Sequence, residues 1–248
     1  MNKITQLIRL KETDSTNREV FRLLQTQTLP EGTILITENQ FAGRGQGQSS
    51  WESEPGKNLT FSLILRPVFL PPAEQFYLNQ TIALGIKDCL EKFLPSDTIS
   101  IKWPNDIYFA NGKIAGILIE NRILGSQFDL SVAGIGINVN QLTFLSNAPN
   151  PVSMINISGK SFILDHVLET CAENILSWYQ VLKNQEFPKI KLAYITNLYG
   201  FGKWLGFKSS EKLFQGMISG VDDYGRLQIK EPNGHTHSFD FKEVSFML

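Results

Sequence analysis

Lys102-Trp103-Pro104-Asn105-Asp106, with Gly112-Lys113-Ile114-Ala115-Gly116 after it, is the stretch from which the fold is predicted. The residues before the first lysine predict a strand, and the Pro-Asn-Asp run has turn chemistry. Asn111-Gly112 is a strong hairpin signal between residues 107–110 and 113–120. The sequence therefore predicts antiparallel strands that hold two lysines at their ends.

Strict alternation along the second of these strands assigns its side chains to two faces. It puts Lys113 on the face opposite Gly116, whose missing side chain leaves a gap for a ligand or another backbone. Two lysines, this glycine and Asp106 lie within 15 residues, as a site for phosphate and carboxylate groups requires. Two solvated lysines on a surface hairpin explain the pattern about equally well.

A glycine loop precedes this hairpin in the chain. Gly43, Gly45 and Gly47 let the backbone approach a phosphate, and Arg44 offers a bidentate cation. No Gly-Lys-Ser/Thr and no helix start follows, which excludes a Walker loop and a dinucleotide fingerprint. A mobile surface loop is the alternative. Trp51 favours a binding loop, because an indole in a polar segment is expected to pack on a base or on the folded loop.

Gly134, Gly136 and Asn138 follow one another at every second position of a predicted strand over residues 128–138. This spacing puts all three on one face of the sheet. Glycine inside a strand is unfavourable by roughly 0.5–1 kcal/mol relative to alanine, so a reason is required. Either a neighbouring element packs closely here, or a flat ligand lies on the bare backbone with the Asn138 amide at its rim.

The remaining periodicities predict an α+β chain. A capping box of Thr16 and Glu19 starts a helix that reaches about Gln25. Further helices are expected from Pro71-Pro72 to Pro95, over 162–182 and over 189–198, and further strands over 32–37 and 59–65. After residue 200, short strands over 204–207, 213–221, 226–230 and 236–241 predict a small barrel. We expect one domain at 1–200 and another at 201–248.

Bulk properties exclude several classes. The net charge of −1 offers no general attraction to nucleic acid or to an anionic membrane. Neither a secretion signal nor a run of ~20 apolar residues is found. Cys89 and Cys171, the two cysteines, are far apart in sequence and suit a reducing compartment, so a cytoplasmic protein is expected. The three histidines form no recognisable catalytic or metal-binding pattern.

With these motifs in this order, the chain resembles the biotin–protein ligase (biotin–[acetyl-CoA-carboxylase] ligase) family over nearly its whole length. The resemblance implies a mixed β-sheet flanked by helices, related to class II aminoacyl-tRNA synthetases, and a C-terminal SH3-like barrel. It also implies the activity: biotin and ATP give biotinyl-5'-AMP, and biotin then passes to one lysine of a biotin carboxyl carrier protein. ATP, biotin and Mg²⁺ are the implied ligands, and a homodimer is left open.

The resemblance also assigns roles to residues. The positions that it places against biotin, ATP or the adenylate are Ser15, Thr16, Asn17, Gln40, Gly43, Arg44, Gly45, Gln46, Trp51, Asn105, Lys113, Gly116, Gly134, Gly136 and Asn138. Catalysis is expected from Lys113, Arg44 and Lys102, which with Mg²⁺ screen the repulsion between a carboxylate and an α-phosphate. Asp106 is the candidate to position or deprotonate the acceptor lysine. Metal ligands are not predicted.

Two departures from the family pattern affect these expectations. Gln46 stands where a second loop arginine is usual, and Gln48-Ser49 replaces a Gly-Arg or Gly-Asn pair. Lys57 is the nearest substitute cation in sequence, although it fits a solvated strand edge better. We therefore expect weaker retention of the adenylate, and slower release after Gln46→Arg. In addition, only one predicted strand precedes Asp14, so a DNA-binding domain and repressor activity are not expected.

Three alternatives stay open. A lipoate–protein ligase shares the implied fold and chemistry, but its usual Arg-Arg pair and Gly-Gly-Gly run are absent. A nucleic-acid-binding module could combine an Arg-Gly loop, an aromatic residue and a small barrel. A non-catalytic sensor of biotin or nucleotide could use the same pocket without turnover.

Overall fold

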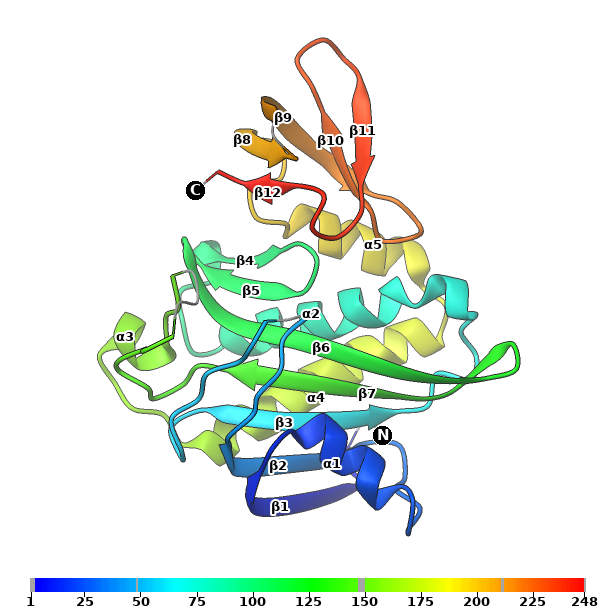
Figure 1. Cartoon of the computed structure of the whole chain (residues 1–248), viewed down its shortest axis with the longest axis vertical. Coiled ribbons are helices and arrows are strands. Elements are labelled where there is room, and N and C mark those ends of the chain that lie inside the picture. The colour runs from blue at the N-terminus through cyan, green and yellow to red at the C-terminus, as the bar shows by residue number, and fades with distance from the viewer. Residues whose placement is uncertain (1–2, 48, 147–149, 211, 248) are drawn as a thin grey trace.

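The larger part of the protein is a seven-stranded mixed sheet (Figure 1). The structure is a computed structural model, and it describes residues 3–47, 49–146, 150–210 and 212–247. Across the sheet the strands are β1 (Gln6–Thr13), β2 (Thr33–Gln40), β3 (Leu59–Leu65), β7 (Gln127–Ile137), β6 (Gly112–Leu124), β5 (Asp106–Phe109) and β4 (Ile99–Lys102). Strands β1 and β2 are parallel, and the other neighbouring pairs are antiparallel. Gln48 and residues 147–149, which belong to two predicted loops, lie outside the described residues.

Helices flank this sheet on both faces (Figure 1). The α-helices of the described part are α1 (Thr16–Leu23), α2 (Phe76–Leu90), α3 (Met154–Ser158), α4 (Leu164–Lys183) and α5 (Phe187–Thr196). Two 3₁₀ turns, Pro72–Glu74 and Ser96–Thr98, precede α2 and β4. Helices α2 and α4 lie behind the sheet in the figure, whereas α1 and the segment between β2 and β3 lie in front. The predicted α+β fold with a mixed sheet is therefore confirmed.

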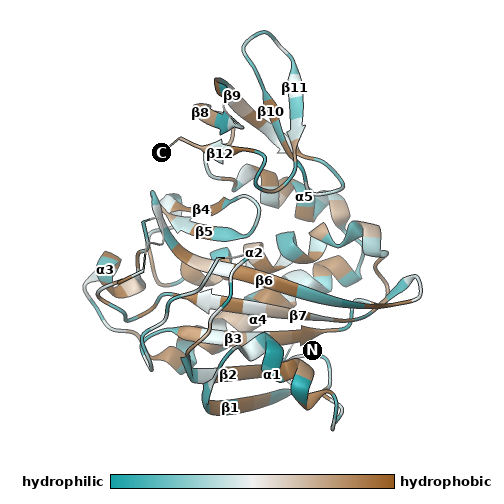
Figure 2. Ribbon diagram, in the orientation of Figure 1, coloured by the Kyte–Doolittle hydropathy of each residue, from teal (hydrophilic) through white to brown (hydrophobic). Residues whose placement is uncertain are grey.

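The main core lies between the sheet and the helices α2 and α4. Alternate residues of the central strands, such as Leu63 and Ile135, pack there against Ile82, Ile86 and Ile175, and all are nearly or fully buried. Each such side chain stabilises the fold by roughly 1.5–3 kcal/mol through the apolar surface it removes from water. Figure 2 shows this pattern as hydrophobic residues along the central strands and hydrophilic residues on the outer side of α1.

The opposite face of the sheet is covered only in part. Helix α1 buries Val20 there against Leu35, Ile64 and Val132, which form a second, smaller cluster. Farther along the same face, the central strands carry Ser62, Thr60 and the two glycines of β7 in place of large apolar residues. This half of the face has too little apolar surface to hold a helix, and it forms the floor of the cavity described below.

The C-terminal region forms a second, antiparallel sheet of five strands (Figure 1). Its order is β11 (Thr236–Phe239), β10 (Leu227–Lys230), β9 (Lys212–Val221), β8 (Trp204–Ser209) and β12 (Ser245–Phe246). The described pairings do not close the order into a ring. This sheet packs on the rest of the protein: Trp103 Nε1 donates to the Gly225 carbonyl at 2.8 Å, and Lys191 of α5 pairs with Asp223 at 2.8 Å.

Some local expectations were wrong. The N-cap of α1 is Ser15, not Thr16, and no side chain caps it. Glu19 lies four residues after this N-cap, one too far for a capping box, and pairs with Arg22. Helix α2 begins at Phe76, after the 3₁₀ turn Pro72–Glu74. Helix α3, which Ser153 and Asn156 start with a reciprocal capping box, was not predicted, because it is only five residues long. In the described part, no helix is long and apolar enough to cross a membrane.

Gly85 sets how closely α2 and α4 approach. A Cβ atom built on Gly85 would lie 2.5 Å from Ile175 Cα and 2.7 Å from Ile175 N, which are backbone atoms that cannot rotate away. The two helices therefore meet backbone to backbone at this point, and glycine is required there despite its poor helix propensity.

We predict that Gly85→Ala lowers the free energy of unfolding by about 1–3 kcal/mol, because the added methyl overpacks the helix contact. An ordinary glycine-to-alanine change inside a helix raises it by about 0.5–1 kcal/mol. Urea unfolding of the variant, with Ser177→Ala on the exposed side of α4 as control, measures the difference. Stabilisation by Gly85→Ala would contradict the close contact.

Candidate active site

A cavity of about 270 Å³ opens over the uncovered half of the sheet. Its wall comes from α1, the glycine loop between β2 and β3, the β4–β5 turn, β6, β7 and the C-terminal region. The residues that line it include Ser15, Thr16, Asn17, Gln40, Arg44, Gly45, Gln46, Trp51, Lys102, Asn105, Asp106, Tyr108, Lys113, Gly116, Leu118, Gly134, Gly136 and Phe241. Five sequence segments that are far apart in the chain thus meet in one place.

The floor of the cavity is backbone without side chains. Gly116 of β6 pairs with Gly136 on the neighbouring strand β7. Two residues farther along, Leu118 pairs with Gly134. The Trp51 indole lies on this floor: a Cβ atom on Gly136 would overlap the ring, and one on Gly116 would lie 3.1 Å from Cζ3. Trp51 Nε1 is buried without a hydrogen-bond partner among the described residues. The indole occupies the surface that the sequence predicted for a flat ring.

The start of α1 forms a polar corner beside the floor. Asn17 is almost fully buried, accepts from Ser62 Oγ at 2.6 Å, and donates to the Leu118 carbonyl and to Glu120 at 3.1 and 2.8 Å. The Thr16 backbone N–H donates to Gln40 Oε1 at 2.9 Å. These bonds fix the donors and acceptors of the corner before any ligand arrives.

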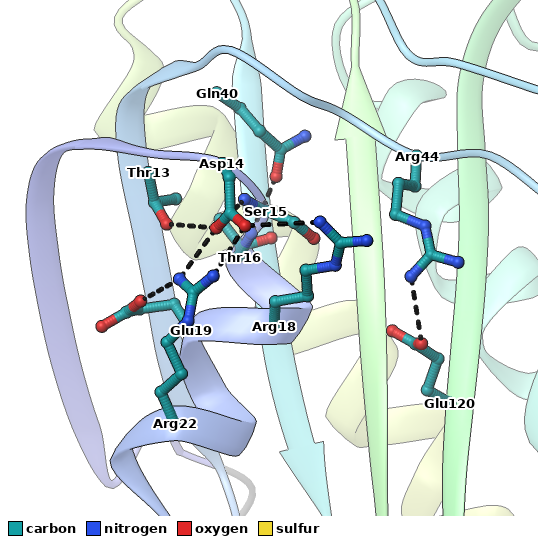
Figure 3. A network of polar contacts seen from close by, with 10 residues as sticks. All are labelled: Thr13, Asp14, Ser15, Thr16, Arg18, Glu19, Arg22, Gln40, Arg44 and Glu120. Carbon is teal, nitrogen blue, oxygen red and sulfur yellow. Dashed lines mark hydrogen bonds and ion pairs between the residues drawn. The ribbon is translucent and has the colours of Figure 1, made fainter.

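An ion network behind this corner holds the turn into α1 (Figure 3). Arg22 donates to both oxygens of Asp14, at 2.8 and 2.6 Å, and Asp14 also accepts from the Ser15 N–H. The bonds from Arg22 hold the pKa of Asp14 well below its usual range. Asp14 is therefore a permanent anion that fixes the Ser15-Thr16-Asn17 backbone, and it does not line the cavity.

The two predicted lysines take different partners. Lys113 Nζ lies 2.7 Å from an Asp106 oxygen and 5.6 Å from the centre of the Trp51 ring. Lys102 Nζ lies 3.2 Å from the Tyr108 hydroxyl and over the rings of Tyr108 and Phe246. Burial lowers the pKa of Lys102 below its ordinary value of 10.5, with the nearby Lys113 charge adding to this and Asp106 opposing it.

The predicted alternation of the second hairpin strand was wrong. Ile107 pairs with Ala115, but its neighbour Tyr108 pairs with Lys113, so Ile114 is an extra residue in a β-bulge. Ile114 and Ala115 are both buried, and Lys113 turns to the same side as Gly116, with Nζ 3.4 Å from a Cβ built there. The turn itself is Ala110-Asn111, one residue earlier than expected.

The glycine loop carries Arg44 over the cavity. Arg44 Nη1 lies 3.8 Å from Glu120 on β6, and Figure 3 shows the guanidinium reaching from the loop towards this carboxylate. A Cβ atom on Gly43 would lie 2.5 Å from the Trp51 carbonyl, so glycine is needed where the loop folds on itself. Gln46 Oε1 is buried without a partner among the described residues. Lys57 does not line the cavity.

The β4–β5 turn is anchored from below. The Pro104 carbonyl accepts from Tyr194 of α5 at 2.8 Å and from Asn79 of α2 at 2.5 Å. Asn105 Nδ2 donates to the Ile117 carbonyl at 2.6 Å, while the Ile117 N–H donates back to the Asn105 carbonyl at 3.1 Å. Asn105 and Asp106 are thus held on rigid supports from two helices and a strand.

Most of the predicted site residues meet in this cavity, but two do not line it. Gly43 lies in the fold of the loop, and Asn138 donates to the carbonyls of Lys113 and Val152 at 3.3 and 3.1 Å. Asn138 is thus a support for the Lys113 backbone, and its predicted contact with a base stays untested. Glu120 was not among the predicted residues, although its spacing of four residues from Gly116 and two from Leu118 puts it on the same face of a regular strand. No sequence signal pointed to Phe241.

Metal-binding groups are few. In the part of the chain that the structure describes, no three His, Cys, Asp or Glu side chains gather to hold an ion. Within the cavity wall, Asp106 supplies a carboxylate and Asn105 an amide oxygen. This donor set fits Mg²⁺ only as an ion that arrives with phosphate oxygens, which is how Mg²⁺ is usually bound.

Comparisons with known proteins agree on one family. The profile of the "Biotin/lipoate A/B protein ligase family" matches residues 10–138, and that of the "Biotin protein ligase C terminal domain" matches residues 208–247. A biotin--[acetyl-CoA-carboxylase] ligase of Paracoccus denitrificans is 30% identical, over 91% of this chain and 94% of that protein. A biotin protein ligase of Aquifex aeolicus, solved with biotin and ATP, is 28% identical with a TM-score of 0.78, and covers 98% of this chain and 99% of its own.

The buried charge of Lys102 makes a prediction for stability. Between its lowered folded-state pKa and 10.5 the unfolded chain binds more protons, so this lysine makes stability rise with pH in that window. Lys102→Met keeps the apolar stem and removes the charge. We expect the variant to be as stable as the parent at pH 7, within about 1 kcal/mol, and to lack this rise.

Urea unfolding at several pH values from 7 to the alkaline limit of the fold measures the effect as the difference between parent and variant. Lys92→Met, at an exposed lysine, serves as the control. A marked loss of stability at pH 7 with an unchanged pH profile would show that Lys102 is stabilised as a cation.

Proposed function

This chain belongs to the biotin/lipoate A/B protein ligase family, and we propose that it activates biotin with ATP and transfers it to a lysine of a biotin carboxyl carrier protein. The observation that carries the proposal is the position of Lys113, beside a bare glycine floor and against Asp106. A cation fixed at the edge of a flat, side-chain-free surface suits a ligand with a planar ring and a carboxylate tail.

The polar corner and the floor give such a ligand its two kinds of contact. A ureido ring presents N–H donors and a carbonyl acceptor, and Ser15, Thr16, Asn17 and Gln40 offer both donors and acceptors. The apolar part of the ring system would lie on Gly134 and Gly136. The Trp51 indole lies over Gly136 and beside Gly116, where it would border the bound rings.

In the first step a carboxylate oxygen attacks the α-phosphorus of ATP, and the bond to the leaving pyrophosphate breaks. No proton has to move, but two anions have to meet. Arg44, Lys113 and Lys102 line the cavity and offset that repulsion, most strongly where water is excluded. Mg²⁺ bound with ATP supplies further charge neutralisation, and Asp106 and Asn105 are the side chains placed to share it.

In the second step the amine of the carrier lysine attacks the acyl carbon, and AMP leaves. The amine has to lose a proton first. Asp106 is the carboxylate at the cavity wall, and Lys113 holds it at 2.7 Å. We infer that Asp106 becomes available as the base when Lys113 turns to the acyl phosphate, so that one exchange of partners links the two steps.

The setting follows from the same proposal. A carrier protein as acceptor is proposed from the likeness to a biotin--[acetyl-CoA-carboxylase] ligase. A cytoplasmic location and the absence of a nucleic-acid partner agree with the net charge of −1 and with two buried, free cysteines. A homodimer is compatible with the proposal.

The proposal is tested by ATP–pyrophosphate exchange that depends on biotin, followed by transfer of label to a carrier domain. Lipoate in place of biotin distinguishes the two acids named in the family description. We expect exchange with biotin alone. Lys113→Ala should reduce the exchange rate by about 10²–10³-fold, since it removes a preorganised charge from the transition state.

Lys160→Ala, at an exposed lysine outside the cavity, is the matched control and should keep the parent rate. Exchange driven by lipoate only would assign the other substrate. Biotin binding without exchange, or exchange that survives Lys113→Ala, would exclude this mechanism.

A further inference from the structure

The turn between β11 and β12 reaches the mouth of the cavity from the C-terminal sheet. Residues 240–243 are closed by two bonds, from the Glu243 N–H to the Asp240 carbonyl at 3.1 Å and from the Asp240 N–H to Glu243 Oε2 at 2.8 Å. Phe241 lies in the cavity wall, with its ring centre 6.4 Å from that of Trp103. The turn is therefore held in place on both sides of Lys242.

Lys242 extends from this turn onto the glycine loop. Its Nζ and Cε would lie 2.5 and 3.3 Å from a Cβ atom built on Gly47, so the side chain takes the space that Gly47 leaves free. The backbone of Lys242 has a φ of +71°, a conformation that glycine adopts far more readily than lysine. Other non-glycine residues share a positive φ, but this one puts a cation against the predicted phosphate loop.

The charges around the loop show why this cation matters. Arg44 lies near Glu120, and Lys113 pairs with Asp106. Lys242 forms no ion pair with any residue that the structure describes, and it lies beside the ring of Phe241 at 5.6 Å. It is thus an uncommitted positive charge one residue from the cavity wall, next to a loop whose own sequence supplies only Arg44 between residues 41 and 51.

We propose that Lys242 completes the glycine loop: its ammonium group binds phosphate oxygens of the adenylate. The inference rests on the proposed function and deepens it, because it adds a phosphate-binding cation from the C-terminal sheet. Arg44 is the only Lys or Arg in residues 41–51, and Lys242 adds a second positive charge from another region of the chain. The left-handed backbone is the strain that a functional position tolerates.

Lys242→Gly tests the proposal without endangering the fold. Glycine prefers the left-handed backbone, so the melting temperature should stay equal or rise. We expect release of biotinyl-5'-AMP to become about 10-fold faster, as loss of a charge-assisted hydrogen bond implies. The Kd of biotin, which has no phosphate, should stay unchanged in calorimetric titration. Lys242→Arg should restore slow release.

Lys203→Ala is the matched control for Lys242→Ala, because both lysines are exposed and belong to the C-terminal region. Unchanged adenylate release in Lys242→Gly, or equal losses of biotin and adenylate affinity, would overturn the inference. The parent protein is assayed for biotin-dependent exchange in parallel, so failure of this inference can be distinguished from failure of the proposed function. Parent exchange with unchanged release in the variant rejects Lys242 alone, whereas no parent exchange rejects the proposed function and this inference together.

Discussion

Gly116 and Gly136 face each other across β6 and β7, and every contact in the cavity depends on the room that they leave. A side chain at either position would displace Trp51, and the indole in turn lies within reach of Lys113. The bare patch exists because the sheet face that carries α1 has two parts. Apolar residues lie under α1, and glycines and small polar residues lie on the part that α1 does not cover. The strand composition therefore leaves the floor of the cavity bare, and the glycine loop adds part of its wall.

Opposite charges in the site are already paired before a ligand arrives. Lys113 pairs with Asp106, Arg44 lies near Glu120, and Asn17 also bonds Glu120. Such pairs keep half-buried cations from standing alone in a low-dielectric pocket, which would be unfavourable. An anionic ligand has to replace the carboxylates that already pair with these cations. Its phosphate therefore gains less binding free energy than it would from cations without partners.

The mixed sheet and the meeting of the motifs in one site were expected only from the resemblance to the family. From its own residues the sequence was sufficient for the α+β class and the β5–β6 hairpin, because periodicity and turn residues act locally. It was not sufficient for the side on which Lys113 lies. One extra residue in a bulge reverses the alternation, and Ile114 carries no signal that distinguishes it from a regular strand residue. Phe241 and Lys242 could not be placed either, because they reach the site only through packing of the C-terminal sheet.

Trp103 connects the two sheets at the site itself. Its ring is buried and its Nε1 bonds the Gly225 carbonyl, while its neighbours Asn105 and Asp106 belong to the cavity wall. The buried cluster around it extends without interruption from α2 to residues of β8, β9 and β10. The C-terminal sheet cannot detach without exposing that indole and loosening the turn. Heating should therefore produce one cooperative calorimetric transition, with both sheets lost together.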